Sequence, residues 1–556
     1  MLEKYITTKK FDKYEDFVKN FKITVPDNFN FGFDIVDGWA EQEPSKKALV
    51  WCDDKGEEKT FTFSDIKKYT NKTANFFKRI GIKKGDTVLL ILKRRFEFWF
   101  SVVALHKIGA IGIPATHLLT EKDIVYRCNA ADVKMAVVVD AHGLIDVVNQ
   151  AQAKTPTLKY KVCANSKGAD GWYNFTEEIE KESDIFERPQ GQDATTNNDN
   201  MLLYFTSGTT GMPKMVTHDF TYPLGLLIVG QWHNLKENGL HITVADTGWA
   251  KAAWGKIYAQ WITGTTVFVY DFDKFTPKDI LEQISKHKVT SFCAPPTIYR
   301  YLIKEDLKSY DLSNLKYCTI AGEPLDAEMY NRWLEITGIR LMESYGQTEL
   351  VSIIGNFPMM TPKPGSIGKP APYYDIDIVD DNYNSCEFGE VGQIVVRLHD
   401  GKKPAGLFNG YYRDPDLTKQ VLHDGLYFTG DTAYKDEDGY IWFVGRADDV
   451  IKSSGYRIGP FEVESALMEH PAVLECAITA VPDPVRGQVV KATIVLAKGY
   501  HASDSLVVEL QNHVKTVTAP YKYPRVVEFV KELPKTISGK IRKVAIRQAD
   551  EQKHKG

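Results

Sequence analysis

The chain has 556 residues, of which 43% are hydrophobic and 26% charged, and this is the composition of an ordinary globular protein. Its length exceeds what a single hydrophobic core supports, so we expect several packed units. The formal net charge of -4 gives no reason to expect nucleic acid or an anionic membrane as a partner.

Seven scattered cysteines and the first ten residues bear on the compartment. The cysteine count is odd and no CxxC pair occurs, which fits poorly with a disulfide framework. Residues 1–10 lack the apolar core of a signal peptide, and no window holds 18 consecutive apolar residues, so we expect no transmembrane segment. These features predict a cytoplasmic enzyme.

Predicted strands and helices alternate over most of the chain. Ser64 can cap a helix, which is followed by a buried strand at 87–92 and a helix at 97–108. Thr276 can cap a further helix, and a strand at 289–294 follows it. This alternation predicts an α/β fold with parallel sheets covered by helices.

The pattern changes after Glu387. Short strands separated by glycine-containing turns are predicted at 391–397 and 440–444. Beyond Asp448 the chain has the pattern of a small α+β module, with helices expected at 461–469 and 506–514 and strands at 477–481 and 490–496. We therefore expect a large N-terminal domain of several subdomains, residues 1–447, and a small C-terminal domain, residues 448–556.

The densest motif runs from Tyr204 to Lys214 and reads YFTSGTTGMPK. Its two glycines let backbone N–H groups turn toward an anion without obstruction by a Cβ atom, which is how phosphate-binding nests form. Hydroxyl donors and the charge of Lys214 add to such a site. The candidate phosphate ligands are Thr206, Ser207, Gly208, Thr209, Thr210, Gly211 and Lys214.

This motif is not a Walker A loop. That loop requires Ser or Thr after its lysine, whereas Lys214 follows Pro213 and precedes Met215. A P-loop nucleotidase is therefore disfavoured. A polar hairpin turn without any ligand remains the alternative for this segment taken alone.

A second polar motif, Glu343 to Glu349 (ESYGQTE), follows an apolar strand expected at 339–342. It would lie at the carboxyl end of that strand, where open α/β sheets bind ligands. Glu349 is suited to hold Mg²⁺, because this cation takes carboxylate and phosphate oxygens together. Thr348 can donate a hydrogen bond to a phosphate oxygen.

Three further segments carry candidate ligands. The turn Gly322, Glu323 and Pro324 could line a purine pocket, although an ordinary turn is an equal alternative. Asp431 offers a carboxylate to ribose hydroxyls, and Arg446 is a plausible partner for it. The basic segment 533–543 contains Lys540 and would, by composition alone, be a surface tail.

Together, in this order and spacing, the motifs resemble the adenylate-forming superfamily of acyl-CoA synthetases, luciferases and carrier-loading adenylation domains. The resemblance covers residues 34–543. The segments ADTGWAK at 245–251 and SGYRIGP at 454–460 are most similar to medium-chain acyl-CoA synthetases. This resemblance implies an enzyme with two steps. It would make an acyl-adenylate from ATP and a carboxylic acid and then pass the acyl group to coenzyme A.

The resemblance implies a role for each matching residue. The loop from Thr206 to Lys214 would hold the β- and γ-phosphates, and Thr348 the α-phosphate. Gly322 to Pro324 and Glu343, Ser344 and Tyr345 would surround adenine, and Asp431 and Arg446 would take the ribose. Thr348, Glu349 and Lys540 would be catalytic, with Mg²⁺ on Glu349 and with Lys540 serving adenylation only.

The second step needs a different arrangement, since a thiol must enter. The resemblance makes Asp448 a hinge about which the C-terminal domain rotates to present the segment from Ser454 to Arg457. Gly455 fits a position where a pantetheine arm passes close to the backbone. The remaining residues implied for coenzyme A are Ser454 and Tyr456, with Arg457, Arg486, Lys515 and Tyr523 at its nucleotide end. Arg457 is also a candidate ATP-binding residue, and an ordinary surface charge is the equal alternative for each cation.

One position of the second motif bears on which carboxylic acid the enzyme would prefer. Acetate-specific relatives place a tryptophan before the Gln-Thr-Glu of the second motif, whereas this chain has Gly346, which predicts an open acyl pocket. Trp249, Trp254 and Gly255 could line it. A longer apolar pocket favours longer acids by roughly 0.8 kcal/mol per CH₂. We expect medium-chain, branched or aryl acids rather than acetate.

Three rival functions remain to be distinguished. An aryl-acid ligase of the benzoate type would share every motif. A carrier-loading adenylation domain is disfavoured by the segment that resembles a coenzyme A loop. A nucleotide-binding pseudoenzyme would be expected to lack at least one of Glu349, Asp431 and Lys540, and all three are present. The oligomeric state does not follow from the sequence.

Overall fold

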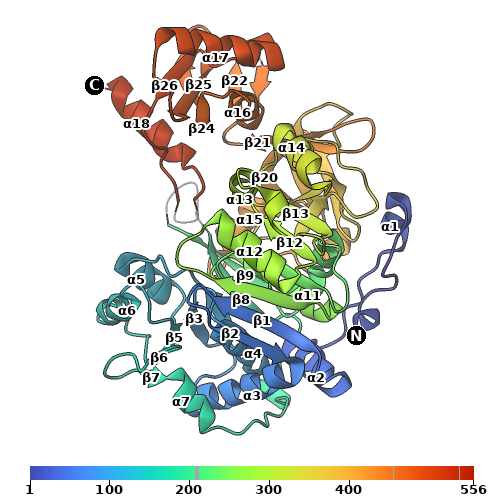
Figure 1. The fold of residues 1–556 in the computed structure, drawn as a ribbon, viewed down its shortest axis with the longest axis vertical. Helices are drawn as coiled ribbons and strands as arrows, with labels where there is room; N and C mark the ends of the chain where they lie inside the picture. Colours follow the sequence, from blue (N-terminus) through green and yellow to red (C-terminus); the bar gives the residue numbers. More distant parts are fainter. Residues whose placement is uncertain (207–211, 455, 537–538, 556) are drawn as a thin grey trace.

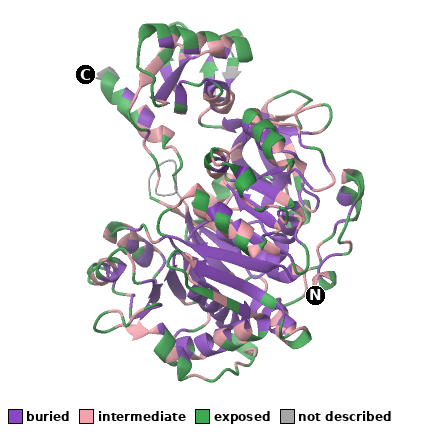
Figure 2. Cartoon of the chain, in the orientation of Figure 1, coloured by how far each residue is buried: buried purple, intermediate pink, exposed green. Residues whose placement is uncertain are grey.

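The computed structural model describes residues 1–206, 212–454, 456–536 and 539–555 (Figure 1). It contains four sheets, and the chain builds them largely in order from the N-terminus. Figure 2 shows that the strands are mostly buried, whereas the outer helices carry the exposed residues. No helix in the described part of the chain is long and apolar enough to span a bilayer.

The first sheet has seven strands and is parallel except at one edge. Its continuous apolar strands are typical of a parallel sheet covered on both faces. The order is β7 (Tyr173–Asn174), β6 (Tyr160–Cys163), β5 (Met135–Val138), β3 (Thr87–Ile91), β4 (Ile111–Pro114), β8 (Asn200–Thr206) and β9 (Lys214–Asp219). Strands β8 and β9 form an antiparallel hairpin, with Thr206 opposite Lys214.

The second sheet has nine strands with a parallel centre. The order is β16 (Lys369–Pro370), β15 (Ser352–Gly355), β14 (Leu341–Gly346), β13 (Tyr317–Ala321), β12 (Ser291–Ala294), β10 (Leu240–Thr243), β11 (Thr266–Asp271), β1 (Lys47–Asp53) and β2 (Glu58–Thr62). The expected strand at 339–342 is longer than predicted, because antiparallel pairing with β15 carries β14 on to Gly346.

Helices cover these sheets as the alternation predicts. The helix α4 (Glu97–Ile108) is buried along its whole length and packs against α3 (Phe63–Arg79). The other helices of this part are α1 (Tyr14–Asn20), α2 (Gly38–Gln42), α5 (Glu121–Ala130), α6 (Leu144–Gln152), α7 (Phe175–Glu180), α8 (Tyr222–Gly225), α9 (Leu227–Trp232), α10 (Ala250–Gly255), α11 (Tyr258–Thr263), α12 (Pro277–His287), α13 (Pro296–Leu302) and α14 (Ala327–Thr337).

Capping explains where two of these helices begin. Thr276 accepts a hydrogen bond from the backbone N–H of Asp279 and caps α12, as predicted. The prediction that Ser64 caps α3 is wrong. Thr62 is the cap, since it is extended and exchanges reciprocal hydrogen bonds with Asp65, so that Ser64 already lies inside the helix.

A smaller antiparallel sheet follows, with the order β17 (Asp375–Val379), β18 (Gly392–Arg397), β20 (Leu426–Lys435) and β19 (Leu422–His423). The strand β21 (Ile441–Arg446) pairs with β20, and the helix α15 (Pro415–Val421) packs beside it. An antiparallel bridge joins Val216 of β9 to Tyr411, so the first sheet and this region are tied together.

The last sheet begins after a turn at 447–450. Its order is β23 (Tyr456–Ile458), β22 (Ile451–Ser453), β25 (Gly487–Leu496) and β24 (Val473–Asp483), with β26 (Val526–Phe529) paired to β25. Its helices are α16 (Pro460–Met468), α17 (Asp504–Val517) and α18 (Lys543–Lys555). It has an apolar core of its own that includes Ile451, Leu467 and Leu510. Figure 1 shows this module at the end of the molecule that carries the C-terminus.

Helix α18 has no counterpart among the predicted elements. Its sequence is rich in charge, and Ile546 is its main apolar contact, packed with Ala477, Val495 and Leu533. All seven cysteines are free thiols, which agrees with the expectation from their spacing.

Candidate active site

The polar motifs of the sequence meet around the carboxyl ends of β13 and β14. The hairpin of β8 and β9 brings Lys214 to this edge, and β20 brings Asp431. Residues 207–211 of the phosphate motif and Gly455 lie outside the described residues, as does the side chain of Arg457.

Asp431 is the centre of one polar cluster. Its Oδ2 atom accepts hydrogen bonds from the Tyr345 hydroxyl and from Gln347 Nε2, both at 2.6 Å. Its Oδ1 atom lies 3.3 Å from Arg446 Nη1. Burial raises the pKa of this carboxyl, while the Arg446 charge and the two donors oppose that rise. The side chain is therefore held in one orientation, with Arg446 beside it.

Gln347 was not among the predicted site residues. Its Nε2 atom also donates to the Thr429 carbonyl at 2.8 Å, and its Oε1 atom accepts from the Tyr427 hydroxyl at 3.0 Å. All these bonds fix the orientation of its amide. Its position inside the motif was a usable signal, because it directly precedes Thr348 and Glu349.

Glu349 and Lys214 form a second cluster. The Tyr411 hydroxyl donates to Glu349 Oε1 at 2.9 Å, and Lys214 Nζ lies 5.2 Å from the centre of the Tyr411 ring. The bridge between Val216 and Tyr411 explains this proximity, since it brings the start of β9 alongside Tyr411. The Glu349 carboxylate thus contacts the hydroxyl of Tyr411, and the Lys214 ammonium group lies over its ring.

His218 positions Thr348 through its backbone. The two are joined by a 2.7 Å hydrogen bond between His218 Nε2 and the Thr348 carbonyl, and the imidazole stacks on Tyr222 with ring centroids 3.9 Å apart. Burial lowers the pKa of His218 to about 4. The ring is therefore neutral at pH 7, and its Nε2–H is the donor. Sequence reasoning missed this residue, which carries no motif.

The predicted purine turn is braced from behind. Gly322 has φ +101°, in the left-handed region that favours glycine. Glu343 is buried, and its Oε1 atom accepts a hydrogen bond from the backbone N–H of Leu325 at 3.1 Å. Burial raises the pKa of Glu343 well above its usual value. Its side chain supports the turn, and its carbonyl accepts from the Asn356 N–H at 2.9 Å, so Glu343 braces the turn from behind.

Ser344 is also committed to the fold. Its hydroxyl bonds with Ser352 Oγ and with the Ile354 carbonyl, both on β15. Of the three residues expected to surround adenine from β14, only Tyr345 directs its side chain toward the Asp431 cluster.

Lys251, from the segment that resembles medium-chain synthetases, also faces this edge. Its Nζ atom donates to the Ala321 carbonyl at 2.6 Å, directly before Gly322. Burial lowers the pKa of Lys251; Cys293 and Glu323 oppose that fall, and the positive charge of Lys540 adds to it. The charge of Lys540, on the segment before α18, therefore acts on the edge that carries the predicted purine turn.

Trp254 and Gly346, both predicted to line the acyl pocket, lie in direct contact. A Cβ atom at Gly346 would lie 2.4 Å from Trp254 Cη2 and 2.2 Å from the Val351 carbonyl oxygen. Glycine is required there because the buried Trp254 ring packs against it. Gly255 is likewise a packing residue, since its Cβ would lie 1.9 Å from Thr243 Oγ1. Trp249 is partly buried just before α10.

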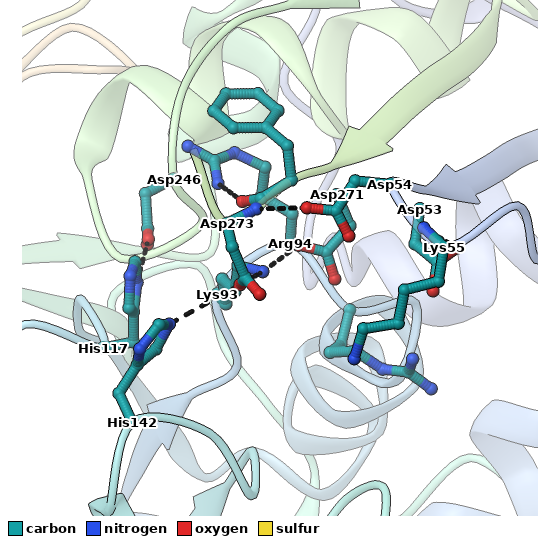
Figure 3. Close-up of polar contacts among 12 residues, drawn as sticks. Asp53, Asp54, Lys55, Lys93, Arg94, His117, His142, Asp246, Asp271 and Asp273 are labelled. Atoms are coloured by element: carbon teal, nitrogen blue, oxygen red, sulfur yellow. Dashed lines mark hydrogen bonds and ion pairs between the residues drawn. The ribbon is translucent and has the colours of Figure 1, made fainter. Parts of the chain in front are cut away.

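The loop before Trp249 is tied to the end of β4. Figure 3 shows His117 pointing at Asp246, and the distance from His117 Nδ1 to Asp246 Oδ2 is 2.8 Å. The other carboxylate oxygen accepts from the Gly248 N–H at 2.8 Å. His142 stands beside His117, with ring centroids 5.3 Å apart.

The same loop is tied to the end of β3 through Lys93. The Lys93 carbonyl accepts from the backbone N–H of Thr247 at 2.9 Å. Its ammonium group lies 3.0 Å from Asp271 Oδ1 and 2.5 Å from Asp273 Oδ1 (Figure 3). These contacts join the two large sheets and fix the segment that leads into α10, on which Lys251 and Trp254 lie.

The residues predicted to bind coenzyme A lie on the C-terminal module in separate groups. Arg486 Nη1 donates to Ser454 Oγ at 3.2 Å. Lys515 Nζ lies 4.3 Å from the centre of the Tyr523 ring. Tyr456 instead stacks on Tyr521, with centroids 4.1 Å apart.

Asp448 is exposed in the turn between β21 and β22. Its carboxylate lies 3.7 Å from Arg446 Nε. The next residue, Asp449, pairs with Arg547 of α18. The turn is thus held by Arg446 on one side and by α18 on the other.

Two family models match the chain. The model of AMP-binding enzymes matches residues 36–412, and the model of the AMP-binding enzyme C-terminal domain matches residues 462–540. Among curated relatives, the acyl-coenzyme A synthetase ACSM3, mitochondrial, of Homo sapiens is 42% identical over 98% of this chain and 93% of its own. ACSM5, mitochondrial, of Rattus norvegicus is 43% identical over 95% of this chain and 92% of its own.

Two solved structures superpose on nearly the whole chain. The anthranilate CoA ligase AuaEII in complex with anthranoyl-AMP superposes with a TM-score of 0.86 at 29% identity, covering 96% of this chain and 99% of its own. The acyl-CoA synthetase of Brucella canis superposes with a TM-score of 0.73 at 30% identity, covering 98% of this chain and 100% of its own.

The expectation of a cytoplasmic location is wrong, because the relatives that match nearly the whole chain are named as mitochondrial proteins. The argument from residues 1–10 addressed only the apolar core of a secretory signal. Mitochondrial transit peptides are amphipathic and rich in Arg and Ser, so the lack of an apolar core does not bear on them.

Proposed function

Because this chain belongs to the AMP-binding enzyme family and is an AMP-forming acid–CoA ligase, we propose that its substrate is a medium-chain, branched or aryl carboxylic acid. We infer a mitochondrial location from the names of its relatives. One observation supports the residue roles below: Asp431, Glu349 and Lys214 lie around the motif that follows β14, and the charge of Lys540 acts on Lys251 at the same edge.

In the first step the acid carboxylate attacks the α-phosphorus of ATP, and pyrophosphate leaves. The main obstacle is repulsion between a carboxylate and a polyanion, so preorganised positive charge is what the site must supply. Lys214 lies at the base of the phosphate hairpin, and Lys540 faces the same edge from the C-terminal module. We assign the triphosphate to the first and the developing charge at the α-phosphate to the second.

The nucleoside would be held by the Asp431 cluster and by the turn at Gly322 to Pro324. Asp431, fixed by Tyr345 and Gln347, is placed to accept ribose hydroxyls, and Arg446 holds its second oxygen. The turn at Gly322 to Pro324 would border adenine, supported by Glu343 from behind. His218 holds the Thr348 carbonyl, which orients Thr348 toward the α-phosphate.

Glu349 fits the role of an Mg²⁺ ligand. Magnesium is usually held by one or two carboxylates together with substrate phosphate oxygens. Within the described residues Tyr411 bonds to Oε1 of Glu349, and no hydrogen bond is made to its Oε2. When bound, the ion would neutralise phosphate charge. The chain itself supplies Lys214 and Lys540 for the same purpose.

In the second step the thiol of coenzyme A attacks the acyl carbonyl carbon, the C–S bond forms and AMP leaves. We propose that rotation about Asp448 withdraws Lys540 and presents the segment that begins at Ser454. Residues 1–447 and 448–556 would then move as two bodies. Arg486, Lys515 and Tyr523 would receive the nucleotide end of coenzyme A.

The experiment is ATP turnover with Mg²⁺ and coenzyme A over acids from C2 to C12 and aryl acids, with AMP, ADP and pyrophosphate followed separately. AMP and pyrophosphate that form only with particular acids support the proposal and identify the preferred acid. A highest kcat/KM for acetate contradicts the proposed substrate class.

An aryl acid is the second candidate, since the anthranilate ligase superposes over nearly the whole chain. Trp254 packs against Gly346 and would offer a flat ring to the proposed pocket, and aromatic rings pack well on one another. Benzoate or anthranilate turned over faster than octanoate would favour this candidate.

A further inference from the structure

The C-terminal module packs on the rest of the chain through a short apolar strip. Strand β21 contributes Phe443 and Val444, and the beginning of α16 contributes Gly459, Pro460 and Phe461. The rings of Phe443 and Phe461 meet edge to face, with centroids 6.0 Å apart. Contacts of this kind depend on close approach, so they are sensitive to a single added methyl group.

Gly459 is the tightest point of the strip. A Cβ atom there would lie 2.5 Å from the Val444 carbonyl oxygen and 2.6 Å from Val444 Cγ1. Val444 is the bulged residue of β21, and its neighbours Phe443 and Gly445 pair with Ala433 and Thr432, so the backbone is held on both sides of it. Gly459 itself has φ -75° and ψ 126°, an extended conformation open to any residue. The contact, and not the backbone conformation, therefore demands glycine.

The two partners lie on opposite sides of the proposed hinge. Val444 precedes Asp448 and Gly459 follows it, so a rotation about that residue separates them. The contact belongs to the arrangement seen here, in which α16 packs on β21 and the charge of Lys540 acts on Lys251 beside the turn at Gly322. Packed interfaces of this kind switch between discrete arrangements rather than deforming continuously.

We propose that Gly459 is a positioning residue for the adenylation step. Its missing side chain lets α16 close on β21, and this closure brings Lys540 to the site. A side chain at 459 would shift the module away from this arrangement and leave the other arrangement unaffected. This inference rests on the proposed function, which assigns adenylation to the arrangement with Lys540 at the site.

The test separates the two half-reactions. Acid-dependent exchange of pyrophosphate into ATP reports adenylation without coenzyme A, and thioester formation from a synthetic acyl-adenylate reports the second step. For Gly459→Ala we expect exchange to fall at least tenfold, with thioester formation within twofold of the unchanged protein. Gly459→Val should deepen the loss of exchange.

Gly112→Ala is the matched control. Gly112 also lacks a positive φ, but a Cβ atom there would lie 3.5 Å from its nearest neighbour, Leu202 Cδ2, which is an ordinary contact. Both half-reactions of this variant should stay within twofold.

Phe461→Ala tests the same strip without adding bulk, in case Gly459→Ala does not fold. Removing its edge-to-face contact should lower exchange about threefold and spare thioester formation. Equal losses in both half-reactions, or unchanged exchange in Gly459→Ala, would overturn the inference. Absence of both half-reactions in the unchanged protein with every acid would instead remove the proposed function.

Discussion

Three side chains from two segments of the chain contact the Asp431 carboxylate, and this makes it the most constrained carboxylate of the site. Tyr345 and Gln347 donate to one oxygen, and Arg446 lies beside the other. A carboxylate held in this way meets ribose hydroxyls without reorganising. Its position along the chain, in the middle of β20, prevents the backbone from moving in response.

For Asp431→Asn we expect KM for ATP to rise between about tenfold and 100-fold. The change removes the ion pair with Arg446 and turns an acceptor into a donor opposite Gln347, and hydrogen bonds to charged groups contribute about 1.5–3 kcal/mol each. Steady-state kinetics over ATP concentration provides the measurement. Asp438→Asn, at an exposed ion pair with Lys363, is the control and should leave KM unchanged.

Trp254 is the residue that bears most directly on the proposed acyl pocket. Its ring fills the space beside Gly346, so the size of a pocket there would depend on this side chain. For Trp254→Ala we expect the ratio of kcat/KM for octanoate to that for butyrate to rise at least tenfold, because buried CH₂ groups contribute roughly 0.8 kcal/mol each.

The control for this change is Trp442→Ala, since Trp442 stacks on Tyr434 away from the pocket. An unchanged octanoate to butyrate ratio in Trp254→Ala would show that the acyl chain runs elsewhere.

At the scale of elements, β9 does two tasks. Its first residue, Lys214, lies near Glu349 because the strand is bridged to Tyr411. Its fifth residue, His218, forms a hydrogen bond with the Thr348 carbonyl. A single strand thus orients both the phosphate side and the motif that follows β14. This arrangement buries the imidazole of His218, which must therefore stay neutral.

His218 therefore makes stability depend on pH. Its pKa is about 4 in the folded chain and 6.5 as its ordinary value, so the unfolded chain binds one more proton between these limits. The contribution of neutral His218 to the free energy of unfolding is fully present above pH 6.5. It is lost as the pH falls toward 4, by up to about 1.4 kcal/mol per pH unit.

His218→Gln keeps a donor for the Thr348 carbonyl and does not titrate. We expect the drop in melting temperature between pH 7.5 and pH 5.5 to be smaller in this variant than in the unchanged protein. His501→Gln, at an exposed site, should keep the original drop. Equal drops in all three proteins would mean that His218 does not titrate as its burial implies.

At the scale of the whole molecule, the proposed function has two bodies share one site. Residues 1–447 would supply the nucleotide clusters, and the C-terminal module, which has its own apolar core, would supply Lys540. The pairing of Asp449 with Arg547 attaches the far side of the turn to α18. The proposed rotation would therefore be concentrated at Asp448 and its immediate neighbours.

For Asp448→Pro we expect adenylation to persist within threefold while thioester formation falls at least 100-fold. Proline restricts φ to about -65° and removes a backbone donor, so the turn loses the freedom that rotation requires. Pyrophosphate exchange and thioester formation from acyl-adenylate measure the two steps. Asp448→Ala should retain both, and a loss of exchange in Asp448→Pro would contradict the hinge assignment. The pattern is opposite to that expected for Gly459→Ala.

The sequence by itself determined the family, the chemistry and most of the regular elements of this protein. Motif residues such as Glu349 and Asp431 are recognisable because phosphate and ribose impose specific residue types at short spacings. Helices such as α12, with its cap at Thr276, follow from interactions within a few residues. The cap of α3 was missed by two residues because two hydroxyls, Thr62 and Ser64, were available and only the backbone conformation distinguishes them.

Only the tertiary structure decided what each side chain faces. Glu343 supports the purine turn, Trp254 fills the space beside Gly346, and His218 holds Thr348, each through a partner at least 18 residues away in the sequence. The contact of Gly459 with Val444 likewise requires two bodies to meet. Local spacing contains no information on such pairs, because the folding of the whole chain, and not the motif, brings them within reach.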